Sequence, residues 1–103
     1  MIAAFSVAPT VTDNPNGEMS EAVSRAVRVV RESGLPHETT SMFTTIEGEW
    51  DEVMDVIRRA TEAVEAVSPR VSLVIKADIR PGYTDMLHQK IDSLNKHFEE
   101  HED

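Results

Sequence analysis

The sequence predicts an α+β fold in which an antiparallel sheet carries two helices on one face. Three observations support this fold class. Apolar residues alternate with a period of two near the N-terminus and again around residues 71–79, as they do in half-buried strands. Two intervening segments repeat apolar residues every three or four positions, which is typical of amphipathic helices. The threonine-rich segment between those two patterns has no helical period and supplies the remaining strands.

The first strand is expected from Ile2 to Ala8 and stops at Pro9, a residue that cannot donate to a strand ladder. Its alternation places three residues on each face of the sheet. The residues of the face expected to enter the core are Ala3, Phe5 and Val7. A loop rich in Pro, Asn and Gly is expected from Thr10 to Glu18. The first helix then begins at Ser20 and ends at Gly34, because glycine favours the left-handed conformation that follows a helix.

The run from His37 to Glu47 is too long for one typical strand and is expected to form two strands joined near Ser41 and Met42. The second helix is expected from about Glu49 to Val67. Its apolar stripe begins with Trp50, which we expect to pack in the core. Acidic residues suit the positive end of the helix dipole. Those at this helix start are Glu49, Asp51 and Glu52.

The last strand is expected over residues 71–79, and Thr84 is expected to cap a final helix. The apolar seam of that helix comprises Leu87, Ile91, Leu94 and Phe98. The element order is the ferredoxin-like βαββαβ arrangement with a C-terminal helix added. Residues 1–103 are expected to form one such domain. One face of its sheet is left uncovered and mixes polar with apolar residues, which indicates a ligand or a partner.

Composition and charge exclude several classes of function. Ten basic and nineteen acidic side chains give a net charge of −9, which repels phosphate backbones and anionic membranes. The absence of cysteine excludes disulfides, thiolate catalysis and cysteine-type zinc sites. No window approaches the ~18 apolar residues that a membrane helix requires. We therefore expect no nucleic-acid partner, no membrane partner and a cytoplasmic location.

The sequence predicts no catalytic residue and no metal site. It lacks the G-x-S-x-G, P-loop and dinucleotide-binding patterns. The segment "HFEEH", from His97 to His101, matches H-x-x-E-H, but helices fray at a terminus and no third ligand lies nearby. Glu47 stands apart from the helix-start acids because it ends a strand just before Gly48, where a structural and a binding role fit equally. An enzyme that uses Glu47 and Asp78 as an acid–base pair stays open as an alternative.

Three stretches of the chain resemble a known family. They are "AAFSVAP", "ESGLPHETTSMFTTIEGEWDEVMDVI" and "PRVSLVIKADIR", and they resemble the small thiamine-binding proteins formerly grouped as UPF0045. The similarity spans nearly the whole chain, and "IEGEWDEVM" is its most specific part. The resemblance implies a ferredoxin-like fold whose chains pair through their sheets as homodimers or homotetramers. It also implies a pocket for thiamine or its hydroxymethylpyrimidine part, with no catalytic turnover, no cofactor and no metal.

The same resemblance implies a set of ligand-binding residues. Those that match its motifs are Ser6, Glu47, Trp50, Lys76 and Asp78. Thr40 and Thr45 are added because strand alternation is expected to place them on the same face of the sheet as those residues. Phe43 stands where relatives commonly have glycine, and "RPGY" at 80–83 replaces a more charged stretch, so Phe43 is expected to narrow the pocket or change its ligand. An oligomer that binds no small molecule and uses the open face only as an interface stays open as a second alternative.

Overall fold

A computed structural model describes residues 1–10 and 20–101, with only the backbone described for Ser20, Lys90 and residues 99–101. Apart from Thr10, the expected loop from Thr10 to Glu18 therefore lies outside the described residues. The elements are β1 (Ile2–Pro9), α1 (Ser20–Glu32), β2 (His37–Thr39), β3 (Thr44–Glu47), α2 (Trp50–Glu65), β4 (Val71–Asp78) and α3 (Met86–His101). They confirm the predicted order, with boundaries that agree to within about two residues.

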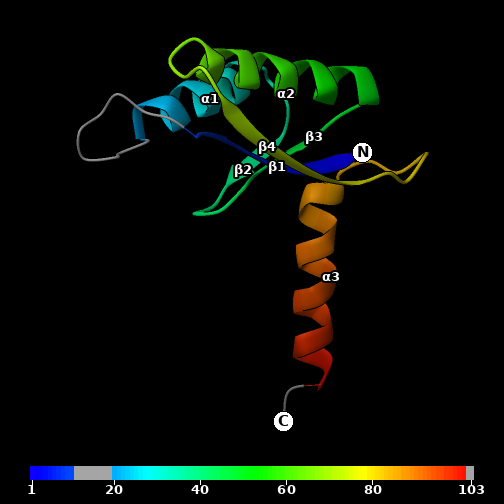
Figure 1. Cartoon of the computed structure of the whole chain (residues 1–103). Helices are drawn as coiled ribbons and strands as arrows, with labels where there is room; N and C mark the ends of the chain where they lie inside the picture. The colour runs from blue at the N-terminus through cyan, green and yellow to red at the C-terminus, as the bar shows by residue number, and fades with distance from the viewer. Residues whose placement is uncertain (11–19, 102–103) are drawn as a thin grey trace.

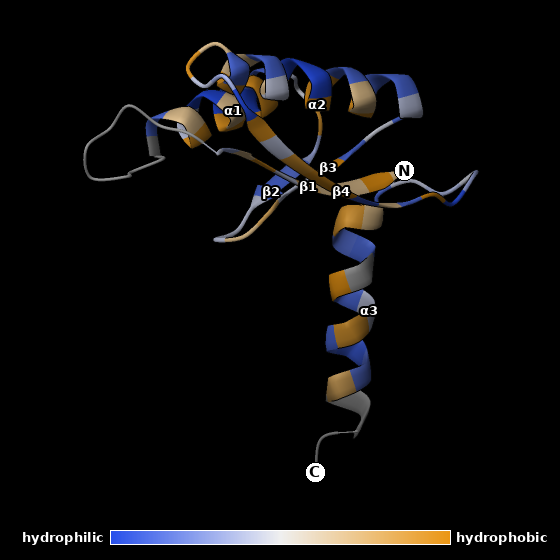
Figure 2. Ribbon diagram, viewed as in Figure 1, coloured by the Kyte–Doolittle hydropathy of each residue, from blue (hydrophilic) through white to orange (hydrophobic). Residues whose placement is uncertain are grey.

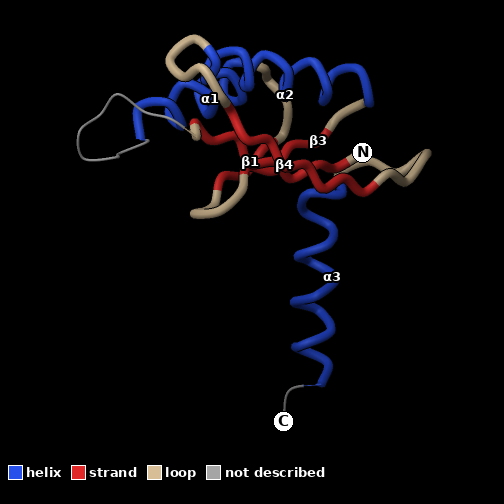
Figure 3. The backbone as a smooth tube through the Cα atoms, in the orientation of Figure 1, coloured by secondary structure: helices blue, strands red, loops and turns tan. Residues whose placement is uncertain are grey.

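The strands form one sheet in the order β2-β3-β1-β4, with every neighbouring pair antiparallel. Helices α1 and α2 cover one face of this sheet, and α3 extends away on the other side (Figure 1). Figure 3 shows the four strands crossing between those two layers. The predicted ferredoxin-like α+β fold is confirmed.

The core lies between the sheet and the helix pair. The face of β1 that was predicted to enter the core is buried, with Phe5 only 2% exposed. Buried residues of α2 recur at helical spacing along the face that meets the sheet and α1. They are Val53, Val56, Ile57, Ala60 and Val64. Gly34 takes a φ of 79° after α1, which confirms its predicted role as the residue that ends this helix.

Strand β1 is paired unequally on its two sides. It pairs with β4 from Ile2 to Pro9, along its whole length. On the other side β3 reaches only to Phe5, which lies opposite Thr44, the first residue of β3. Before that residue the chain turns away, and the turn is closed by a hydrogen bond of 2.9 Å from the Thr40 N–H to the Phe43 carbonyl. Residues 6–9 therefore have no described strand on their β3 side.

Glu47, the last residue of β3, anchors the start of α3. Its carboxylate oxygens accept hydrogen bonds from the backbone N–H groups of Met86, at 2.7 Å, and Leu87, at 3.1 Å. The prediction that Thr84 caps this helix is wrong, because α3 begins two residues later and Glu47 reaches its free N–H groups from across the fold. Asp85 takes a φ of 57° just before the helix, a conformation that aspartate tolerates better than most residues.

Among the α3 residues whose side chains are described, only those of the first turn are buried. Met86 and Leu87 are each 5% exposed, whereas the rest of the predicted seam stays open to solvent. The exposed fractions are 52% for Ile91, 51% for Leu94 and 60% for Phe98. Figure 2 shows these apolar residues as bands along a helix that contacts the body at one end. The radius of gyration is accordingly 15.9 Å, against about 13 Å for a compact domain of this length.

The prediction that Trp50 packs in the core is wrong. Its side chain is 55% exposed, although it continues the apolar stripe of α2. The physical reason is its place as the first residue of α2, since helical side chains point back toward the N-terminus and here beyond the packed layer. Burial begins one turn later, at Val53. The predicted electrostatics of this helix start are confirmed, because Glu52 accepts a 3.0 Å hydrogen bond from the Glu49 N–H.

Candidate functional site

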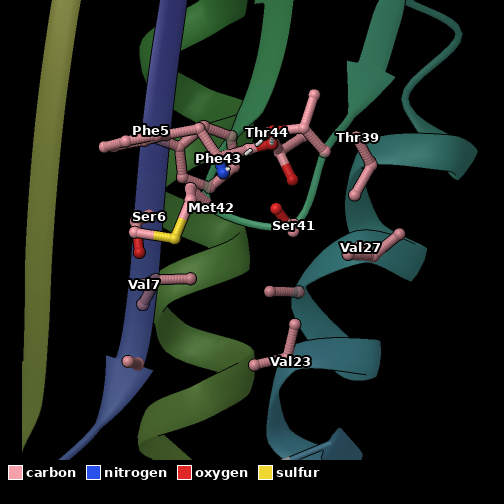
Figure 4. A pocket seen from close by; sticks show the side chains of 13 residues that line it. Phe5, Ser6, Val7, Val23, Val27, Thr39, Ser41, Met42, Phe43 and Thr44 are labelled. Carbon is pink, nitrogen blue, oxygen red and sulfur yellow. Dashed lines mark hydrogen bonds between the residues drawn. The ribbon is translucent and has the colours of Figure 1, made fainter.

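A hollow of about 140 Å³ lies beside the unpaired part of β1, and we call it the edge pocket. Its walls come from β1, α1 and the turn between β2 and β3 (Figure 4). The lining residues are 5–8, Val23, Ala26, Val27 and 39–44. A cavity of about 150 Å³ holds one benzene ring. The edge pocket therefore has the size of a single six-membered ring.

Aromatic and aliphatic side chains form most of the pocket wall. Figure 4 shows Phe5 and Phe43 at one end and Val23 at the other. Phe5 is buried in the core between the sheet and the helices, whereas Phe43 is 37% exposed. We call the solvent-exposed side of the pocket at Phe43 its mouth. Among the described residues that line the pocket, none carries a charge. The pocket therefore suits a flat neutral ring, whose desolvation supplies most of the binding energy.

Hydroxyl groups supply the polar side chains of the edge pocket. Ser6 is half-buried, and its side chain bonds to no described residue. The Thr40 hydroxyl is already engaged: it donates to the Phe43 carbonyl at 3.1 Å and accepts from the Phe43 N–H at 3.3 Å. Thr40 thus fixes the turn that carries Phe43, while Ser6 offers a hydrogen bond to a ligand.

The predicted carboxylate Glu47 lies elsewhere, at the opposite end of β3. It is only 7% exposed, and both of its oxygens are engaged by the start of α3. A hollow of about 390 Å³ borders it, next to Met1, Gly48 and Tyr83. The Met1 amino group donates to the Gly48 carbonyl at 2.8 Å, which ties the N-terminus to this end of the sheet. The visible geometry gives Glu47 a structural partner within the protein.

The open face of the sheet carries a third hollow, of about 550 Å³, which brings Thr45, Lys76 and Asp78 together. The register explains this grouping, because Thr45 and Lys76 lie opposite Ala4 on its two neighbouring strands. Six of the seven predicted residues are therefore spread over three hollows rather than one. Trp50 lines none of these three hollows.

The described residues form neither a metal cluster nor a membrane-spanning helix. Among the described residues, no three His, Asp or Glu side chains gather as a metal site. This statement covers only part of the "HFEEH" segment, because the side chains of residues 99–101 are not described. No helix within residues 1–10 and 20–101 has the length and apolar character of a membrane span.

A family model for thiamine-binding proteins matches residues 3–95. The chain belongs to the thiamine-binding protein family. Relatives include the UPF0045 proteins of Mycobacterium bovis and Mycobacterium tuberculosis. Each is 51% identical over 98 residues, which cover 94% of this chain and 93% of the relative.

Solved structures with a similar fold come from several organisms. An uncharacterised protein of Methanocaldococcus jannascii has a TM-score of 0.81 at 25% identity, covering 92% of this chain and 95% of that one. A protein of Bacillus cereus, of unknown function, has a TM-score of 0.77 at 33% identity, covering 87% and 85%. A candidate thiamine biosynthesis or salvage protein of Thermotoga maritima has a TM-score of 0.77 at 26% identity, covering 90% and 96%.

Sequence reasoning did not identify the residues of α1 that line the edge pocket. Val23 and Val27 lie on the apolar stripe of α1, yet Val23 is 41% exposed and both line the edge pocket. The width of the apolar stripe of α1 could have indicated this wall of the pocket. Ala22 and Ala26 already cover the core on this helix, so two further valines beside them exceed what the core needs.

Proposed function

We propose that the protein binds thiamine or its hydroxymethylpyrimidine part in the edge pocket and does not transform it. One observation carries the proposal, namely a ring-sized pocket between Phe5 and Val23 in a chain of the thiamine-binding family. Aromatic and aliphatic walls suit the faces of a pyrimidine, and the Ser6 hydroxyl suits a ring nitrogen or an exocyclic amine.

The pyrimidine ring, rather than the thiazolium ring, is proposed to enter the pocket. Thiamine carries a fixed positive charge on its thiazolium, and an isolated buried charge is costly. None of the described residues that line the edge pocket offers a carboxylate to offset that charge. The thiazolium would then stay at the mouth in water, and thiamine would act as a ligand rather than a cofactor.

Calorimetric titration with thiamine and with hydroxymethylpyrimidine tests the proposal. We expect both to bind, with affinities within about tenfold of each other, because the charged ring adds little desolvated contact. Ser6→Ala is expected to weaken both by about 2- to 10-fold through one lost hydrogen bond. The matched control is Ser72→Ala, an exposed serine on β4 outside the pocket. No heat with either ligand, together with unchanged melting at millimolar ligand, would refute the binding proposal.

Phe43 is expected to set the preference between the two ligands. Replacing it by glycine opens the mouth of the pocket and removes an aromatic wall from the pyrimidine. We expect the ratio of thiamine affinity to hydroxymethylpyrimidine affinity to rise by about 3- to 10-fold. Tyr83→Ala serves as the control, since this exposed aromatic residue lies outside the edge pocket. An unchanged ratio in the Phe43 variant would show that the mouth does not select the ligand.

We also propose that the protein assembles as a homodimer or homotetramer through the open face of its sheet. Apolar side chains on that face are exposed, among them Val74 at 52% and Ile79 at 57%. The uncovered seam of α3 extends on the same side of the sheet (Figure 1). Exposed apolar groups gathered on one side mark a protein interface, and a second copy would cover both sets. The hollow that holds Thr45, Lys76 and Asp78 would then lie at this interface.

Two alternatives make different predictions for the same measurements. An assembly protein without a ligand would give the oligomeric mass and no binding heat. An enzyme would return a changed ligand after long incubation, whereas we expect chemically intact ligand by mass spectrometry. The acid–base pair of Glu47 and Asp78 receives no support from the geometry, because Glu47 is held by α3 and borders a different hollow.

A further inference from the structure

The two sides of β1 can be distinguished by the direction of its main-chain groups. Along an antiparallel strand, successive residues direct their N–H and C=O groups to alternate sides. Met1 donates to the Gly48 carbonyl at 2.8 Å, and the Gly48 N–H donates to the Met1 carbonyl at 3.1 Å. Position 1 therefore faces the β3 side. The register with β3 continues without a slip to Phe5, so odd-numbered residues face that side.

The other side of the strand gives the same assignment independently. The Thr10 N–H donates to the Arg70 carbonyl at 3.0 Å, which places an even-numbered residue toward β4. The register with β4 is continuous from Ile2 to Pro9. Two observations at opposite ends of the strand thus agree that the Val7 N–H and C=O point away from β4.

Val7 lies just beyond the last residue that β3 reaches. β3 ends its pairing with β1 at Phe5, and no described residue pairs with the main chain of Val7 on that side. Val7 lines the edge pocket, so its main-chain donor and acceptor are directed toward the hollow. A buried main-chain pair of this kind normally has a partner, because leaving both groups without a hydrogen bond is unfavourable.

We infer that the main-chain N–H and C=O of Val7 recognise the aminopyrimidine edge of the ligand. A 4-aminopyrimidine places a ring nitrogen that accepts beside an exocyclic amine that donates. That edge reproduces the acceptor and donor that a residue of β3 would have offered to Val7. This inference rests on the proposed function and assigns the orientation of the ring: amino edge toward β1, faces toward Phe5 and the valines of α1.

The unpaired edge is too short for an added β-strand. Of residues 6–9, only Val7 and Pro9 face the β3 side, and Pro9 has no N–H. A strand would gain one complete pair of hydrogen bonds there, whereas strand addition depends on a run of them. One donor beside one acceptor, in a ring-sized hollow without charge, matches a small heterocycle.

Specificity for the amino group follows from this assignment. A site that hydrogen-bonds a ligand group rejects an analogue that lacks it, because the site's own buried group is then left unpaired. The hydroxymethylpyrimidine analogue with hydrogen in place of the 4-amino group is expected to bind about 10- to 100-fold more weakly. Its ring area is nearly unchanged, so loss of apolar contact does not explain such a drop.

The protein side is tested by replacing the amide between Ser6 and Val7 with an ester, which removes the Val7 N–H and keeps every side chain. The chain has no cysteine, so residues 1–21 can be ligated to a chain beginning with cysteine at position 22, and desulfurisation restores Ala22 selectively. The control ester removes the Ala3 N–H, which faces β3 within the paired register. Titration with hydroxymethylpyrimidine and thermal unfolding are measured for both esters and for the all-amide chain.

The Val7 ester is expected to bind hydroxymethylpyrimidine about tenfold more weakly, with a smaller loss of Tm than the Ala3 ester. The Ala3 ester is expected to lose Tm and keep its affinity, because its N–H serves the sheet. If the all-amide chain binds the ligand while the Val7 ester and the 4-deamino analogue retain full affinity, the main-chain assignment is overturned and the proposed function stands. If the analogue loses affinity while the Val7 ester does not, the main-chain assignment is also overturned, since another group then recognises the amine. No binding by the all-amide chain overturns the proposed function itself.

Discussion

Replacing Glu47 by alanine is expected to lower the free energy of unfolding by about 2–4 kcal/mol. The variant leaves the N–H groups of Met86 and Leu87 without acceptors in a buried place. It also removes a negative charge from the positive end of a helix dipole. Urea unfolding followed by circular dichroism gives the change, and α3 is expected to lose order first because its other turns are exposed.

A matched control separates this effect from loss of any acidic side chain. Glu38 is exposed on β2, and its replacement by alanine is expected to change stability by less than about 0.5 kcal/mol. Glu47→Gln keeps one acceptor and is expected to fall between wild type and alanine. If Glu47→Ala matches Glu38→Ala, the hydrogen bonds to α3 contribute nothing and Glu47 is free for another role. A ligand that loses affinity for Glu47→Gln at unchanged stability would restore the binding role first considered for it.

Replacing Leu94 by aspartate is expected to convert the proposed oligomer into monomers. Leu94 lies in the middle of the exposed seam of α3 and is 51% exposed in the single chain. In the proposed assembly it would be covered by the second copy, where an unpaired charge costs about 3–5 kcal/mol per site. Light scattering coupled to size-exclusion chromatography measures the mass directly, and circular dichroism checks that the helix content is kept.

The control for this experiment adds the same charge to the same helix. Gln89 is exposed on α3 and belongs to no part of the seam. Gln89→Asp is therefore expected to leave the mass unchanged. A monomeric wild-type protein would contradict the assembly proposal outright. If the Leu94→Asp variant keeps the oligomeric mass of the wild type, α3 is not part of the interface.

Local patterns were enough to predict the elements and their order. The alternation of apolar residues in β1 and their three- and four-residue spacing in α2 show which face each element buries, because side-chain direction follows the period of the element. Gly34 ends α1 for a conformational reason that applies to the residue alone. The element order then permits few arrangements, because short connections and antiparallel neighbours limit the topology.

The site was harder to predict because its parts come from different elements. Strand parity placed Ser6, Thr45, Lys76 and Asp78 on the open face together, yet the length of β3 decides which of them share a hollow. The turn at Thr40 draws the chain away from β1 and creates the edge pocket, and no local pattern marks that departure.

The sequence by itself determined the ferredoxin-like order of elements, the buried face of β1 and the family, since these depend on the period and identity of neighbouring residues. Tertiary structure alone decided three further points. It left Trp50 exposed, because the helix start projects beyond the layer that would cover it. It assigned Glu47 to α3, because two segments about forty residues apart in the chain meet there. It also ended β3 short of Val7, so that no described strand pairs with Val7 on the side of the ring-sized hollow. Where one strand ends relative to another is set by long-range register, which no local pattern encodes.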